Sequence, residues 1–128
     1  AENFGHTIQQ PVPSLFTFNI PSFPLVDLAG ISVEKAAVSI KGLRMRQVGP
    51  LLITHWGFSG PAVLKLSAWG ARFLHAEDYH VPLLIDWLPD LTQVQIYDAL
   101  QTARNSHSKQ LLNNCHLFTL PKNLWKKL

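Results

Sequence analysis

The strongest constraint on the fold is a change of hydrophobic pattern at the centre of the chain. Residues 50–54 (Pro-Leu-Leu-Ile-Thr) form a short continuous apolar run, which is typical of a buried strand. Two glycines and a proline follow within residues 54–61, and apolar side chains then recur at helical spacing, at Ala62, Leu66, Trp69 and Phe73. The chain therefore has to pass from a buried strand, through a glycine-rich turn, into an amphipathic helix, which we expect over residues 61–76 with Pro61 near its start.

The segments around this transition have the features of strands. Residues 15–20 are rich in β-branched and aromatic side chains, and residues 31–40 alternate in part. Residues 43–48 show the clearest period of two, which places Leu43, Met45 and Gln47 on one face, and a turn at Lys41-Gly42 precedes them. Residues 81–88 predict a last strand, and Pro82 confines it to a sheet edge or to a first position.

The pattern becomes helical after residue 90. Thr92 and Gln95 form a capping box, and an apolar stripe follows at Val94, Tyr97, Leu100 and Ala103. Residues 105–108 end this helix, and Pro121 opens a short one. Strands followed by helices predict an α+β fold, a small β-barrel-like subdomain with an inserted helix followed by the start of a helical subdomain.

The composition is that of a globular chain, with 47% hydrophobic and 15% charged residues. No apolar run approaches the ~20 residues that span a bilayer, so no membrane partner is expected. The first residues lack a signal-peptide pattern, and the single Cys115 cannot form an internal disulfide, so a cytoplasmic location is expected. Both ends resemble interrupted elements, which predicts a fragment of a longer protein.

The segment from Thr54 to Pro61 is the most distinctive candidate for chemistry. Unpaired amides and the dipole at a helix N-terminus can hold an anion or the polar edge of a cofactor, and the imidazole of His55 can donate a hydrogen bond there. The plainer interpretation is a tight strand-to-helix connection, in which the glycines provide positive φ and Ser59 caps the helix. The glycine spacing excludes a phosphate loop.

The histidines and the cysteine suggest other sites only weakly. His75 and His80 flank Glu77 and Asp78, but no third and fourth ligand lie near in sequence, so a solvated loop is favoured and no metal is expected. Cys115 is interpreted as a small buried hydrophobic residue. The sequence indicates no catalytic residue.

Basic side chains gather in two places in the sequence. The first cluster comprises Lys35, Lys41, Arg44 and Arg46, and the second comprises Lys122, Lys126 and Lys127. Aromatic residues are absent from the first cluster, so a nucleic-acid groove receives little support. A non-catalytic binding module, with nucleic acid as the candidate ligand of the basic hairpin, remains the alternative function.

Several segments resemble the middle of a known family of flavoproteins. They are residues 5–8, 11–16, 28–33 and 118–128 and, most specifically, residues 49–67. These segments are similar to FAD-dependent oxidoreductases that are grouped with BaiN and aminoacetone oxidase. In that family a small β-barrel joined to a helical subdomain is inserted into a Rossmann-like FAD domain.

This resemblance implies a domain organisation and a function. Residues 1–14 would be the exit segment of the FAD domain, residues 15–89 the β-barrel-like insert, and residues 90–128 the start of the helical subdomain. The insert would cover the flavin and shape the substrate pocket, with a pocket-facing loop of Thr54, His55, Gly57, Ser59 and Gly60. Its partner would be the FAD-binding remainder of its own chain, and its small-molecule substrate is unknown.

The expected cofactor is FAD in the full-length protein, with a link to NAD(P) left open. The glycines of this chain form no Gly-x-Gly-x-x-Gly turn, so these residues alone are not expected to bind FAD. The parent protein is therefore expected to be an enzyme, and the isolated fragment is expected to be inactive.

Overall fold

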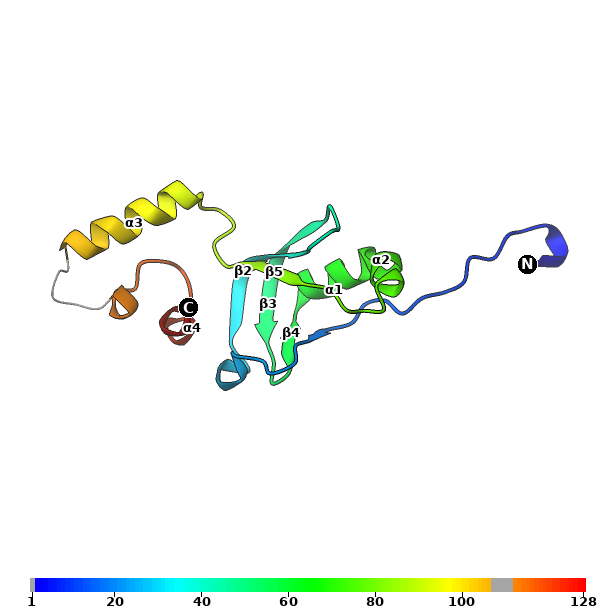
Figure 1. Ribbon diagram of the computed structural model, residues 1–128, viewed down its shortest axis with the longest axis horizontal. Helices are drawn as coiled ribbons and strands as arrows, with labels where there is room; N and C mark the ends of the chain where they lie inside the picture. Colours follow the sequence, from blue (N-terminus) through cyan, green and yellow to red (C-terminus); the bar gives the residue numbers. More distant parts are fainter. Residues whose placement is uncertain (1, 107–111) are drawn as a thin grey trace.

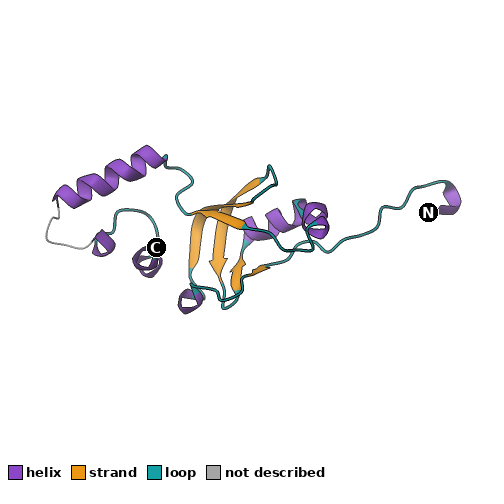
Figure 2. Cartoon of the chain, in the orientation of Figure 1, coloured by secondary structure: helices purple, strands orange, loops and turns teal. Residues whose placement is uncertain are grey.

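The computed structural model describes residues 2–106 and 112–128 of the chain, which runs from an extended N-terminal segment through a curled sheet to a group of helices (Figure 1). Among these residues the sheet is five-stranded and antiparallel, in the order β1-β4-β3-β2-β5. The strands are β1 (Phe18–Asn19), β2 (Ser32–Ile40), β3 (Arg46–Ile53), β4 (Gly57–Ser59) and β5 (Leu83–Asp86). Figure 2 shows the strands together in the middle and the helices outside them, which confirms the α+β class and the half-barrel.

The core lies between the sheet and the helix that follows it. Val38 and Ile40 of β2 and Leu51 and Ile53 of β3 are fully or almost fully buried. Helix α1 (Pro61–Trp69) packs on β3 and β2. Burial of such large aliphatic side chains stabilises the fold by roughly 1.5–3 kcal/mol each relative to exposure.

The predicted helix over residues 61–76 is in fact two helices. Helix α1 ends at Trp69, Gly70 forms its C-terminal cap, and α2 (Ala71–Ala76) begins directly after it. The predicted buried stripe was also partly wrong, because Trp69 is 75% exposed. The buried face of α1 is instead formed by Ala62, Val63, Leu66 and Ser67.

The strand boundaries also differ from the prediction. The expected strand over residues 15–20 shrinks to the two residues of β1, because the amide of Phe16 bonds to the side chain of Ser67 rather than to a strand. The two segments expected over residues 43–48 and 50–54 merge into β3, in which Arg46 and Val48 are exposed on the face opposite Gln47, as the period of two predicted, and Pro50 of the expected buried run is also exposed. Strand β5 lies at a sheet edge, as Pro82 predicted.

The helical part begins with the predicted capping box. The amide of Thr92 donates to Oε1 of Gln95 at 2.8 Å, and the amide of Gln95 donates to Oγ1 of Thr92 at 3.3 Å, at the start of α3 (Gln93–Ser106). The apolar stripe of α3 was correct only in part, since Ala103 is buried whereas Val94 and Tyr97 are 68% and 61% exposed. His107 and Ser108, which were predicted to end the helix, lie outside the described residues.

Three single turns of 3-10 helix and a short last helix complete the chain. The turns are η1 (Glu2–Phe4), η2 (Val26–Leu28) and η3 (Leu112–Asn114), and the helix is α4 (Lys122–Lys127), which follows Pro121 as predicted. Nζ of Lys127 bonds to Oδ2 of Asp27 at 2.9 Å, which links α4 to η2 and lowers the pKa of that carboxyl below its ordinary value. Over residues 2–106 and 112–128, no helix has the length and apolar character needed to cross a membrane.

Candidate functional site

The segment that the sequence singled out is a tight hairpin between β3 and β4. The amide of Thr54 donates to the carbonyl of Gly57 at 2.9 Å, and Oγ1 of Thr54 accepts the amide of Gly57 at 3.1 Å. Oγ1 of Thr54 also lies 3.4 Å from the amide of Trp56. This bonding fixes the turn, so His55 and Trp56 are presented at its exposed tip.

The two glycines of this segment are explained by strand packing. A Cβ atom on Gly57 would lie 2.0 Å from the carbonyl oxygen of Phe18, the residue that β1 pairs with Phe58. A Cβ on Gly60 would lie 2.9 Å from the carbonyl oxygen of Pro50, and the φ of Gly60 is +99°. Both positions therefore require glycine whether or not a ligand binds nearby.

The start of α1 does not offer open amides to an anion. Pro61 has no N–H group, and Ala62 and Val63 have no accessible surface. The cap is Gly60, without a side-chain hydrogen bond, so the expectation that Ser59 caps the helix was wrong. The expected single glycine-rich turn is also corrected, because β4 lies between the turn and the helix. That Thr54, His55, Gly57, Ser59 and Gly60 face a pocket in the intact protein stays a prediction.

A large open cavity lies beside this hairpin. Its volume is about 720 Å³, and its lining includes aromatic rings from three separate parts of the chain, namely Phe16 and Phe18, Trp56, and Tyr79 with His80 beside it. Phe16 makes edge-to-face contacts with both Phe18 and Tyr79, at ring-centroid distances of 5.8 and 5.7 Å. A cavity of this size with aromatic walls and few polar groups suits a flat ring system.

Backbone strain is concentrated around the same cavity. Leu15 has a φ of +60°, and Asp78 and Tyr79 have φ values of +49° and +59°, in a region that large side chains rarely adopt. Each such residue costs on the order of 1–3 kcal/mol, and residues of this kind cluster at binding and catalytic sites. Sequence gave no indication of this strain, because neither Leu nor Tyr favours positive φ.

Buried hydrogen bonds hold the strained segments in place. The hydroxyl of Ser67 is fully buried, accepts the amide of Phe16 at 2.9 Å and donates to the carbonyl of Leu64 at 2.9 Å. The amide of Tyr79, whose ring contacts that of Phe16, donates to the carbonyl of Leu74 at 2.7 Å. The sequence analysis missed Phe16, Ser67 and Tyr79, and only the unusual serine on an apolar helix face could have pointed to one of them.

The structure places the weaker candidates of the sequence in different surroundings. His80 bonds through Nδ1 to the carbonyl of Asp78 at 2.6 Å, in an exposed loop. Within the parts of the chain that the structure describes, His, Cys, Asp and Glu side chains nowhere gather in threes as a metal site. Cys115 is buried, as predicted. In the basic hairpin, Lys35 pairs with Asp90 at 2.7 Å and Arg46 with Asp86 at 2.9 Å, so two of its four cations have acidic partners.

The described residues thus form a half-barrel with an aromatic cavity, followed by a helical part. The sequence profile described as the HI0933-like protein barrel and H2TH domain matches residues 12–128. The chain therefore belongs to this family, which is a family of FAD-dependent flavoproteins.

Two curated relatives extend the comparison. The chain is 33% identical, over 135 residues, to a protein of Escherichia coli (strain K12) named ribosomal RNA dihydrouridine synthase, with all of this chain and 30% of that protein covered. It is 32% identical, over 126 residues, to the Haemophilus influenzae protein of the same name, with 97% of this chain and 28% of that protein covered. The chain thus spans less than a third of the length of these relatives.

Proposed function

We propose that this chain is the barrel and helical insert of an FAD-dependent oxidoreductase that reduces uridine to dihydrouridine in ribosomal RNA. The observation that carries the proposal is the similarity along the full chain to relatives that bear this name. The substrate of the parent would thus be a nucleic acid, which the charge pattern of this chain alone did not favour. Its site of action would be the cytoplasm, and use of NAD(P)H as the source of electrons is part of the same proposal.

The described residues do not fit the dinucleotide part of FAD. The positions next to Gly57 and Gly60 are filled by backbone, and the residues Ala62 and Val63 are buried, so the start of α1 cannot cradle a pyrophosphate. The remainder of the parent chain would have to hold the cofactor, and the redox chemistry belongs to the flavin.

The role proposed for this chain is to cover the active site of the parent protein and to enclose planar rings there. The aromatic cavity next to Trp56 has the shape and lining to exclude water from a planar group, such as a flavin ring or the base that it reduces. The hairpin from Thr54 to Gly60 would face the rest of the protein, with Trp56 at its tip. Its rigidity comes from the Thr54 bonds, so the indole would be held in place before the ligand arrives.

The test is to delete the parent gene and measure dihydrouridine in ribosomal RNA by mass spectrometry. We expect dihydrouridine to be lost at the affected position and restored by the wild-type gene. The Trp56→Ala variant should restore it poorly, whereas Trp69→Ala, which removes an even more exposed indole from α1, should restore it fully. Unchanged dihydrouridine in the deletion strain would refute the proposal.

A further inference from the structure

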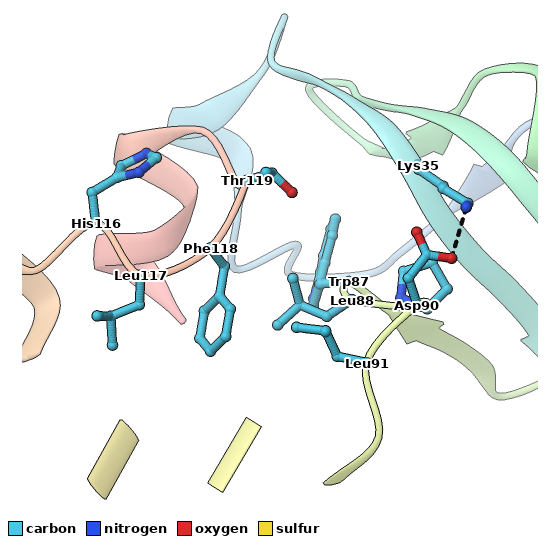
Figure 3. A pocket seen from close by; sticks show the side chains of 10 residues that line it. Lys35, Trp87, Leu88, Asp90, Leu91, His116, Leu117, Phe118 and Thr119 are labelled. Atoms are coloured by element: carbon cyan, nitrogen blue, oxygen red, sulfur yellow. Dashed lines mark hydrogen bonds and ion pairs between the residues drawn. The ribbon is translucent and has the colours of Figure 1, made fainter. Parts of the chain in front are cut away.

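A second cavity lies where the barrel meets the helical part, away from Trp56. Its volume is about 460 Å³, and it is lined by residues 87–91 after β5, by residues 116–119 before α4, and by Lys35 of β2 (Figure 3). A neighbouring hollow of about 530 Å³ shares Lys35, Trp87, Asp90, His116 and Thr119 with it, so the two form one cleft. The cleft shares no lining residue with the aromatic cavity.

One half of this cleft is apolar and is fixed by packing. Trp87, Leu88, Leu91 and Phe118 line it. The ring of Phe118 packs edge-to-face on Trp125 at 5.4 Å, and the ring of Trp87 packs on buried Phe58 at 5.9 Å. Because both rings are held by neighbours, the apolar half is a preformed surface on which a planar ring can stack.

The other half carries polar groups of defined hydrogen-bonding character. Nζ of Lys35 donates to Oδ1 of Asp90 at 2.7 Å, and both side chains are more than half exposed. Figure 3 shows the hydroxyl of Thr119 turned toward this pair across the opening. The ammonium is a donor, the carboxylate is an acceptor, and the hydroxyl can donate. Together they match an imide edge, in which an N–H group lies between two carbonyl oxygens.

The charge of the cleft argues against a phosphate. Glu34 and Asp90 both line it, and Lys35 is the one Lys or Arg among the described lining residues. A phosphate group would therefore meet at least as much negative as positive charge. A neutral ring with an imide edge meets no such repulsion and can bond to the Lys35–Asp90 pair.

We propose that this cleft binds a planar ring through its imide edge, a chemistry shared by the uracil base and the isoalloxazine ring of flavin. If the ring is a uracil of RNA, the cleft is a recognition subsite for a base other than the one beside Trp56, and this source rests on the proposed function. If the ring is flavin, the cleft holds the cofactor. Binding of a ring with an imide edge follows from the residues of the cleft alone and does not depend on the proposed function.

The experiment observes the indole N–H signals of the intact, flavin-loaded protein labelled with ¹⁵N-tryptophan, with Trp87 assigned through Trp87→Phe. We expect millimolar uridine to shift the Trp87 signal and to leave that of Trp69 unchanged. Cytidine and N3-methyluridine lack the imide N–H, so we expect both to bind at least about fivefold more weakly than uridine. Asp90→Asn should weaken uridine binding about fivefold to tenfold, whereas Asp98→Asn on α3 should not change it.

Three outcomes decide between the alternatives. A uridine-dependent shift in the flavin-loaded protein assigns the cleft to uracil. If the Trp87 signal shifts when flavin is removed, and if only the flavin-free protein binds uridine, the cleft is assigned to flavin. No response to either, or equal binding of uridine and N3-methyluridine, overturns the proposal. Loss of dihydrouridine in the deletion strain is measured independently, so failure of this inference is distinguishable from failure of the proposed function.

Discussion

The barrel and helix α3 of this chain bury their apolar side chains to very different degrees. In the barrel, α1 and the sheet enclose side chains such as Leu51 and Leu66 that have no accessible surface. In the helical part, α3 buries only Ala103 fully and leaves Val94 and Tyr97 largely exposed, and Figure 1 shows it standing away from the sheet. The barrel therefore holds most of the core, to which Leu120 and Leu124 near the end of the chain are added, whereas α3 leaves apolar side chains such as Val94 exposed.

The largest effect expected from this comparison is on the free energy of unfolding. Leu66→Ala should cost roughly 2–5 kcal/mol, because it leaves a cavity between α1 and the sheet. Val94→Ala on α3 should change the free energy by less than about 0.5 kcal/mol, because the side chain is already in solvent. Urea unfolding measures both, and equal costs would show that the helical part is as tightly packed as the barrel.

A smaller effect should come from the hairpin that carries Trp56. Gly57→Ala places a methyl group against the carbonyl of Phe18, so β1 has to move or unpair, at a cost of roughly 1–3 kcal/mol. Ser59→Ala, two residues along the same strand, should be near neutral, since no described hydrogen bond uses its hydroxyl. Thermal unfolding and amide exchange of Phe18 and Asn19 provide the test, and an unperturbed β1 would contradict it.

The smallest effect concerns the exposed pair that links the barrel to α4. Lys127 lowers the pKa of Asp27 from its ordinary 3.8, so the pair contributes stability above that pH and loses it as the pH falls through the lowered value. Lys127→Ala should therefore destabilise slightly at pH 7, and this difference should disappear as the pH falls through the lowered pKa of Asp27. Salt should reduce the difference at pH 7. A difference that persists in acid would show that the lysine acts by packing instead.

Features of the fold that depend on interactions between neighbouring residues were predicted from the sequence. Features that depend on contacts between distant segments were not. The capping box of Thr92 and Gln95 was predictable, because both partners lie within one turn of helix. The edge position of β5 is one of the two positions that Pro82 allowed. The break at Gly70 and the exposure of Trp69 were missed, because helical spacing alone does not say which face of α1 meets the sheet.

The candidate sites were less predictable than the fold. Trp56 lies within the segment that the sequence singled out, but its neighbours in the cavity, Phe16 and Tyr79, are far from it in sequence. The cleft between barrel and helices combines Lys35, Asp90 and Thr119 from three separate segments. No spacing rule brings such residues together, so composition and periodicity could not reveal either cavity.

The sequence by itself determined that a buried strand ends at a glycine-containing segment and that a helix follows this segment, because side-chain period and glycine position are local properties. The tertiary structure alone decided that β4 lies between the turn and the helix, and why the glycines of this segment are needed. The glycines turned out to be required by the close approach of Phe18 and Pro50, residues distant in the chain. The two cavities arise from packing between segments far apart in sequence, and packing depends on shape in three dimensions, which no linear pattern encodes.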